Sequence, residues 1–177
     1  MSDNPFDKYL VVLTAGIIKW LDDNSYYTNP ANIHALAYLF LEYTRGGLNF
    51  TSFHYYVRSE IIQHIIRVKL YEGGYLYKEC WYDNGSEKAY YRLINFPPTD
   101  ETKEKIDRMV KEIDNFCKKF DLDGYNMKHL AMVHYILKHK MELAWVKSSL
   151  GWDIDRKKIK KLRPVVEKII RQDKDIK

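Results

Sequence analysis

The chain contains few cysteines and no long uninterrupted hydrophobic run. Its two cysteines, Cys80 and Cys117, lie far apart and neither belongs to a C-x-x-C pair, which excludes a disulfide framework and a zinc knuckle. A reducing cytoplasm is therefore the expected location. The first residues carry no basic segment ahead of an apolar one, and the apolar runs end well before membrane-spanning length, so we expect neither export nor membrane insertion.

Motifs that carry catalysis or bind metals are also missing from the sequence. There is no G-x-S-x-G, P-loop or dinucleotide fingerprint, and the pairs Gly46-Gly47 and Gly73-Gly74 follow expected helices instead of preceding them. His129, His134 and His139 are spaced by five residues, which turns each one away from its predecessor around a helix. We therefore expect no enzymatic activity, no cofactor and no metal site.

What the chain does have is enough apolar material for a folded core and an excess of positive charge. It has 177 residues, of which 46% are hydrophobic, 15% aromatic and 30% charged, a composition typical of a folded, soluble protein. The formal net charge is +5 and the pI is about 9.0. This balance favours an anionic partner such as a nucleic acid.

Two amphipathic helices are expected before residue 45. Apolar residues recur at helical spacing over 7–21 and again over 31–43. Asn29 provides an N-cap for the second helix and Pro30 suits its first turn, whereas Gly46-Gly47 allows a sharp exit into a strand.

A strand, a short corner and a third helix are expected next. The strand covers 48–51, and the aromatic stretch 53–57 is interpreted as a short helical corner packed on the core. Ser59 is expected to cap a helix that runs to Tyr71, in which apolar residues cover far more than one stripe. The sequence thus predicts a largely buried third helix.

A β-hairpin is expected over residues 75–82 and 87–94. Asn84-Gly85 accepts the positive φ angles of a two-residue type I′ turn, which makes this the strongest turn signal in the chain. Such a turn pairs Cys80 with Ala89 on one face of the hairpin. That face is expected to pack, and the opposite face to remain available.

Three further helices are expected after Pro97-Pro98, a pair that interrupts both helix and strand. The helices cover residues 99–120, 126–149 and 155–171. Pro164 is expected to kink or split the last of them. The predicted fold class is therefore α+β and mostly helical, with one unit over residues 1–96 and a helical extension over 97–177.

The segment from 48 to 94, about a quarter of the chain, resembles a winged-helix domain. Its phrase Phe53-His54-Tyr55-Tyr56-Val57-Arg58-Ser59-Glu60-Ile61-Ile62, followed by Gly73-Gly74-Tyr75-Leu76, is similar to archaeal and phage-associated winged-helix proteins. These include the Panacea-type antitoxin domain, in which an aromatic strand, a serine-capped helix and a "GxL" strand entry recur. The resemblance implies a winged helix, with an N-terminal helix ahead of it, over residues 1–96.

In winged-helix proteins that read DNA, the third helix enters the major groove and the hairpin touches the backbone or the minor groove. The resemblance therefore implies two groups of DNA-binding residues. On the helix they are Arg58, Gln63, His64 and Arg67, and on the hairpin they are Lys78, Lys88 and Arg92. Arginine and glutamine can pair with base edges, and lysine suits phosphate.

A second candidate interface is the basic last helix. Its cationic residues are Arg156, Lys157, Lys158, Lys160, Lys161, Arg163, Lys168 and Arg171, opposed within this span only by Glu167. Such a helix can lie along a duplex and neutralise phosphates, giving binding that falls steeply with salt. The alternative interpretation is a solvated charged surface without a ligand.

Two functions remain open from the sequence. The first is a cytoplasmic DNA-binding protein, a transcription regulator that binds double-stranded DNA as a homodimer. The second is a protein-interaction module, antitoxin-like or an adaptor, in which the apolar surface of the third helix engages a protein partner.

Overall fold

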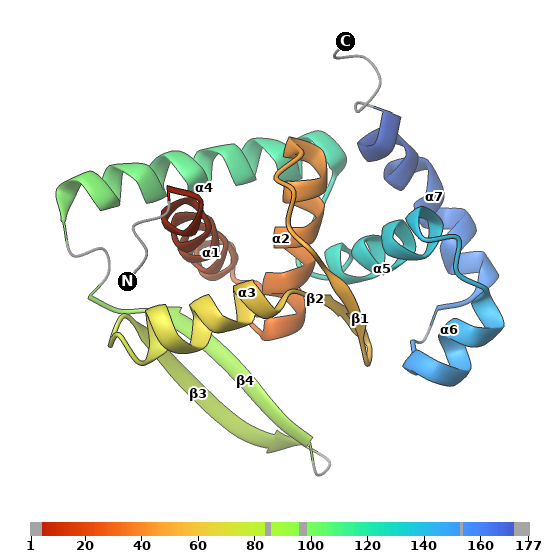
Figure 1. Ribbon diagram of the computed structural model, residues 1–177, viewed down its shortest axis with the longest axis horizontal. Coiled ribbons are helices and arrows are strands. Elements are labelled where there is room, and N and C mark those ends of the chain that lie inside the picture. Colours follow the sequence, from red (N-terminus) through yellow and green to blue (C-terminus); the bar gives the residue numbers. More distant parts are fainter. Residues whose placement is uncertain (1–4, 84–85, 96–98, 153, 172–177) are drawn as a thin grey trace.

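The computed structural model describes residues 5–83, 86–95, 99–152 and 154–171, and within them the fold is α+β and mostly helical, as predicted (Figure 1). The helices are α1 (Pro5–Asp23), α2 (Pro30–Thr44), α3 (Glu60–His64) continuing directly as the π-helix η1 (Ile65–Tyr71), α4 (Asp100–Phe120), α5 (Met127–Lys138), α6 (Leu143–Leu150) and α7 (Arg156–Arg171). The strands are β1 (Thr51–Phe53), β2 (Tyr56–Arg58), β3 (Leu76–Asp83) and β4 (Ser86–Leu93). They form two separate antiparallel hairpins, β1–β2 and β3–β4. Every helix in the described part of the chain is too short or too polar to cross a membrane.

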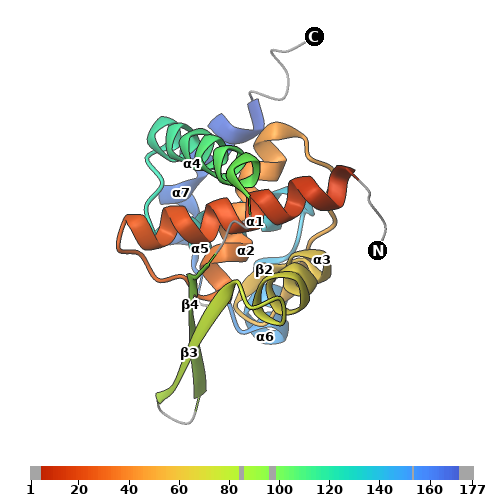
Figure 2. The same ribbon diagram turned by 90° about the vertical axis from the view of Figure 1, so that its left-hand side faces the viewer.

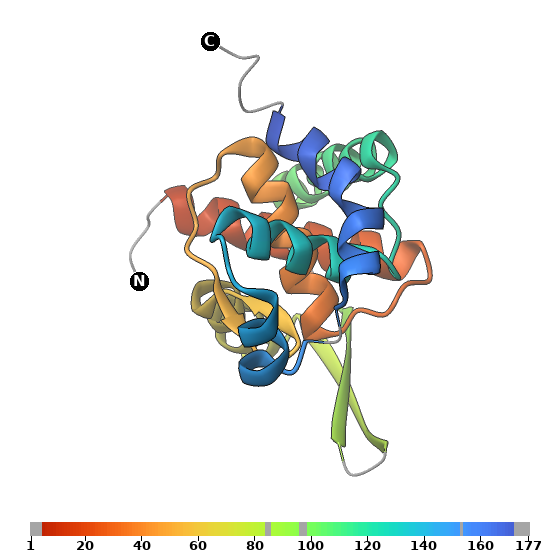
Figure 3. The same cartoon turned by 90° about the vertical axis from the view of Figure 1, so that its right-hand side faces the viewer.

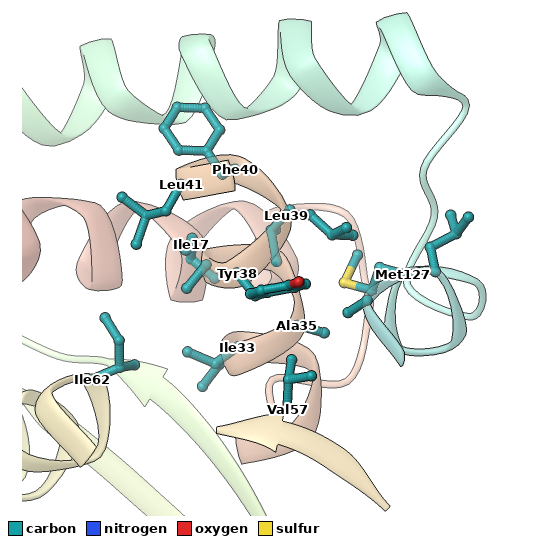
Figure 4. Close-up of a cluster of buried hydrophobic side chains, with 14 of the residues drawn as sticks. Ile17, Ile33, Ala35, Tyr38, Leu39, Phe40, Leu41, Val57, Ile62 and Met127 are labelled. Atoms are coloured by element: carbon teal, nitrogen blue, oxygen red, sulfur yellow. The ribbon is translucent and has the colours of Figure 1, made fainter. Parts of the chain in front are cut away.

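Helix α2 lies at the centre of the core. Its residues from Ala31 to Leu41 are all buried, and Figure 4 shows several of their side chains in one cluster with Ile17 of α1, Val57 of β2 and Met127 of α5. Phe40 meets Phe116 of α4 edge-on, with ring centroids 5.5 Å apart, and the Tyr38 hydroxyl is 2.7 Å from Nδ1 of His134 on α5. One hydrophobic cluster therefore runs from α1 to α7. The proposed division at Pro97-Pro98 lies outside the described residues and stays a prediction.

The two ends of α2 are formed in different ways. The Asn29 side chain accepts a hydrogen bond from the Asn32 N–H at 2.9 Å, which confirms the predicted cap. At the other end, Arg45 takes the left-handed conformation with φ of 57°, and Gly47 has a φ of 62°, so the positive φ expected of the glycine pair is found at Gly47 and also at Arg45. Gly46 is needed for space instead, because a Cβ there would lie 2.2 Å from Cδ2 of Leu41.

The expected helical corner over 53–57 is wrong, and the strand expected at 48–51 is displaced. These residues form the β1–β2 hairpin, in which Thr51 pairs with Arg58 and Phe53 pairs with Tyr56. Aromatic and β-branched side chains fit a pleated, half-buried surface, and this preference outweighs the short length of the segment. Val57 and Tyr56 are buried against α2, so the hairpin is part of the core.

The third helix has the predicted extent and an unexpected form. Ser59 occupies its N-cap position, but its side chain makes no capping hydrogen bond, so the predicted capping role is wrong. From Ile65 onward the helix widens to π geometry, as in the hydrogen bond from the Glu72 N–H to the Arg67 carbonyl at 3.0 Å. Ile62, Ile65, Ile66 and Leu70 are buried, but Ile61 is exposed and Val68 is half-buried, so the expected burial of most of this helix is confirmed only in part.

The β3–β4 hairpin has the predicted register. Cys80 pairs with Ala89 and Leu76 with Leu93, while Asn84-Gly85 lies outside the described residues. The hairpin extends away from the helical body in all three views (Figures 1, 2 and 3). Its base is anchored, because the buried Tyr91 donates its backbone N–H to the Thr28 carbonyl at 3.1 Å.

The single helix expected over 126–149 is wrong, because α5 ends at Lys138 and α6 begins at Leu143. Lys140 adopts a left-handed conformation with φ of 51°, and no glycine or proline marks the break. Tertiary packing explains it, since α5 packs on α2, and Leu130 and Val133 of α5 and Val146 of α6 are all buried in the same core cluster. Helix α7, in contrast, is continuous across Pro164, so the expected split does not occur.

Candidate functional site

Two of the residues predicted on the third helix are held within the protein. Gln63 places its Oε1 atom 3.3 Å from Nε2 of His34, a buried residue of α2. The Arg58 guanidinium lies over the Phe53 ring, 4.5 Å from its centroid, and contacts Glu60 at 3.2 Å. Neither side chain extends freely into solvent, so contact with a ligand would require these interactions to change.

His34 is a functional candidate that sequence reasoning missed. Its Nδ1 atom accepts a hydrogen bond from the Ser59 N–H at 3.2 Å, so its Nε2 atom carries the proton donated to Gln63. Burial lowers the pKa of His34 to about 4, and the imidazole is neutral near pH 7. His34 therefore fixes the start of α3 against α2. Nothing in the local sequence distinguishes this histidine from the others.

His64 and Arg67 form the polar part of the exposed helix surface. Both are exposed, and the Nε atom of Arg67 lies 3.9 Å from Oε1 of Glu72. Large apolar side chains share this surface, because Ile61 is 45% exposed and Tyr71 is 48% exposed. The exposed side of α3 and η1 thus combines a cation, a carboxylate and apolar groups.

The hairpin residues are placed beside this helix. The Tyr75 N–H donates to the Leu70 carbonyl at 2.8 Å, which joins the end of η1 to the start of β3. Lys78 is half-buried on β3, and the side chain of Lys88 lies outside the described set. Arg92 is exposed, and its pKa is raised by its hydrogen bond with Tyr90 and by the Asp22 carboxylate, 3.4 Å from its Nε.

Helix α7 is amphipathic, and its exposed side is almost entirely basic. Val166 and Ile169 are buried against the body. The exposed cations form the "α7 basic face", which consists of Arg156, Lys157, Lys160, Lys161 and Lys168. Arg163 lies beside them and is paired with Glu167 at 2.9 Å. Lys158 is half-buried, with Nζ 3.4 Å from Nε2 of His129 on α5.

Charge is segregated along the chain. Residues 126–171 contain 12 lysines and arginines against 4 aspartates and glutamates, whereas residues 1–125 contain 15 against 18. The positive charge of the protein therefore comes from the C-terminal helices. This charge is concentrated on α7, which carries eight of these 12 cations, whereas the helix and hairpin of the first half are of mixed sign.

The structure brings the predicted residues together in two groups, not one. The third helix and the β3–β4 hairpin are adjacent, but α7 packs on α5, on the other side of α2 from η1 (Figures 1 and 3). A single continuous strip that joins Arg67 to the last helix is therefore absent from the described residues.

In the described part of the chain, no set of side chains is arranged for catalysis. A surface pocket of about 290 Å³ lies between α1, α4 and β4, but its charges are of both signs and Lys19 pairs with Asp23 there at 2.9 Å. Burial raises the pKa of Cys117 to about 12, so this thiol is a poor nucleophile. No cluster of three or more metal-ligating side chains occurs among the described residues.

No protein-family model matches the sequence, and no curated protein matches it either.

Proposed function

We propose that the protein binds double-stranded DNA and acts as a transcription regulator in the cytoplasm. The observation that carries this proposal is the α7 basic face, five exposed cations on one side of a helix in a chain whose first 125 residues carry more acids than bases. A polyanion with regularly spaced phosphates is the partner that such a surface fits best.

The position of the cations on α7 supports the same partner. Arg156, Lys157 and Lys158 occupy the first turn, where the helix dipole is already positive, and each such cation costs about 0.3–1 kcal/mol. One carboxylate lies beside them, because Asp155 accepts a hydrogen bond from the backbone N–H of Lys158 at 2.7 Å, an interaction that lowers the pKa of Asp155. Bound phosphates would offset the remaining repulsion.

In this proposal α3, η1 and the β3–β4 hairpin act as a winged helix. The order of elements and the projecting hairpin support it, as does the exposure of His64 and Arg67 on the helix. Arg67 would contact base edges, while Lys78, Lys88 and Arg92 would contact the backbone. A homodimer would place two such helices on one duplex.

Equilibrium binding to a labelled duplex over a range of salt concentrations tests the proposal. Each lost phosphate contact reduces the slope of log K against log salt by about 0.9, so Lys160→Gln/Lys161→Gln should reduce it by about 2. The matched control is Lys103→Gln/Lys111→Gln, which removes two exposed lysines of α4. Absence of duplex binding at low salt, or equal slopes for the two variants, would contradict the proposal.

A second candidate function is a protein-interaction module. Two observations favour it. Ile61 and Tyr71 are exposed on the third helix, the element that would enter the DNA groove in the first proposal, and Gln63 is hydrogen-bonded to His34 inside the protein. This alternative expects Ile61→Ser to abolish stoichiometric co-purification of a protein partner from the native host, with no nucleic acid in the eluate.

A further inference from the structure

The β1–β2 turn presents a large aromatic side chain to solvent. Tyr55, at its tip, is 56% exposed. The preceding His54 has a φ of +40°, an unfavourable conformation for a residue with a side chain. The turn is held by ring packing beneath it, since the centroids of Phe53 and Tyr56 are 5.6 Å apart. Strained backbone that displays an exposed aromatic group points to a functional role.

Two contacts connect this turn to α7 through α5. The Nζ atom of Lys128, on α5, lies 5.7 Å from the centroid of the Tyr55 ring. The adjacent His129 places Nε2 3.4 Å from Nζ of Lys158. We refer to Tyr55, Lys128, His129 and Lys158 as the "tyrosine–lysine strip". Figures 1 and 3 show α5 between the β1–β2 hairpin and α7, which agrees with these contacts.

The chemistry of this strip suits nucleotides that are not base-paired. An aromatic ring stacks on the face of a base, and neighbouring ammonium groups bind the phosphates on either side. In a duplex the base faces are covered by stacking, so the Tyr55 ring can be used in this way only by an unpaired base. The strip also adjoins the α7 basic face at Lys158, so one nucleic acid could pass from one surface to the other.

We propose that the tyrosine–lysine strip binds a single-stranded segment that continues from the duplex held by α7. Tyr55 stacks on an unpaired base, and Lys128 and Lys158 contact its flanking phosphates. This inference rests on the proposed function, since it assigns a second substrate region to the same basic end of the molecule. It makes no use of α3 or the β3–β4 hairpin.

The test compares a blunt duplex with the same duplex carrying a short oligothymidine extension, by fluorescence anisotropy at fixed salt. The extension should tighten binding about tenfold, the effect of roughly one stacked base. Tyr55→Ala should remove this gain and leave blunt-duplex affinity unchanged. Tyr55→Phe keeps the ring and should keep the gain, and Lys128→Gln should reduce it.

The matched control is Tyr27→Ala, which removes another exposed tyrosine, 62% accessible, in the loop between α1 and α2. It should retain the full gain, and circular dichroism of each variant verifies folding. Duplex binding without any gain from the extension, or a gain that survives Tyr55→Ala, would overturn this inference while the proposed function stands. If the blunt duplex is not bound at all, the proposed function fails, and binding of free oligothymidine then tests the tyrosine–lysine strip by itself. Binding that depends on Tyr55 supports the strip as a single-strand site, and absence of binding overturns it.

Discussion

The Nδ1 atom of His34 accepts the backbone N–H of Ser59 at 3.2 Å, so the residue that begins α3 is fixed by a side chain from α2. The second ring nitrogen bonds to Gln63, four residues further along the same helix. One buried imidazole thus determines the position of the helix that carries Arg67. The hydrogen bond from Ser59 requires the neutral form of the ring, because protonated Nδ1 cannot accept, whereas Nε2 can donate to Gln63 in either form.

This arrangement predicts acid sensitivity. The pKa of His34 is lowered by burial to about 4 from an ordinary value of 6.5, so the unfolded chain binds a proton that the folded chain does not. Stability should be complete above about pH 6.5 and fall as the pH decreases toward 4, by about 3 kcal/mol in total. Urea unfolding across this pH range measures it. His34→Gln should flatten the curve, and an unchanged slope in the variant would contradict the assignment.

A second prediction concerns the packing of α1 on α4. A Cβ on Gly16 would lie 2.8 Å from Cγ of Met109, so this glycine allows the two helices to approach closely. Gly16→Ala should cost about 1–3 kcal/mol of unfolding free energy through overpacking. Because the clash is with one side chain, adding Gly16→Ala to Met109→Ala should cost much less than adding it to the wild type. Strict additivity in this double-mutant cycle would rule the explanation out.

A third prediction tests whether the two parts of the chain unfold together. Phe116 of α4 is buried against Phe40 of α2, across the proposed boundary at residue 97. Phe116→Ala should therefore destabilise the entire protein by about 3–5 kcal/mol, with one transition seen by both far-ultraviolet circular dichroism and tryptophan fluorescence. Two separate transitions, only one of them shifted, would instead indicate independent units.

The two cysteines should differ sharply in reactivity. Cys80 is exposed on β3, while Cys117 is buried and has a raised pKa, which leaves very little thiolate at pH 8. A thiol-specific chromogenic reagent should titrate one group rapidly in the native protein and two in denaturant. Cys80→Ser should abolish the rapid phase, and a persisting rapid phase in that variant would show that Cys117 is accessible.

Local signals in the sequence predict those parts of the fold that local chemistry determines. Asn29 and Thr99 cap the helices that follow them, because a side-chain oxygen beside a free N–H needs no distant partner. The register of β3–β4 follows from a two-residue connection between the strands. The break after Lys138 and the contact between His34 and Gln63 depend on tertiary packing, for which one sequence contains no local signal.

The same distinction applies to the candidate site. The basic residues of α7 are evident in the sequence, because they are consecutive and almost unopposed. The tyrosine–lysine strip was missed, because its members come from the β1–β2 turn, α5 and α7 and meet only in the folded protein. Its one signal in the sequence is the aromatic stretch at 53–57, which on its own indicates core packing.

Different substitutions should affect the preference of the protein for one DNA sequence and its general affinity for duplexes. Arg67 is 70% exposed on η1 and would contact bases, whereas Lys160 and Lys161 would contact phosphates. After selection of a preferred site from random duplexes, Arg67→Ala should weaken binding to that site by about 1–3 kcal/mol and leave affinity for unrelated duplexes nearly unchanged. Lys160→Gln/Lys161→Gln should weaken both to the same extent. If Arg67→Ala instead lowers both affinities equally, Arg67 contacts phosphates and the third helix does not read the sequence through it.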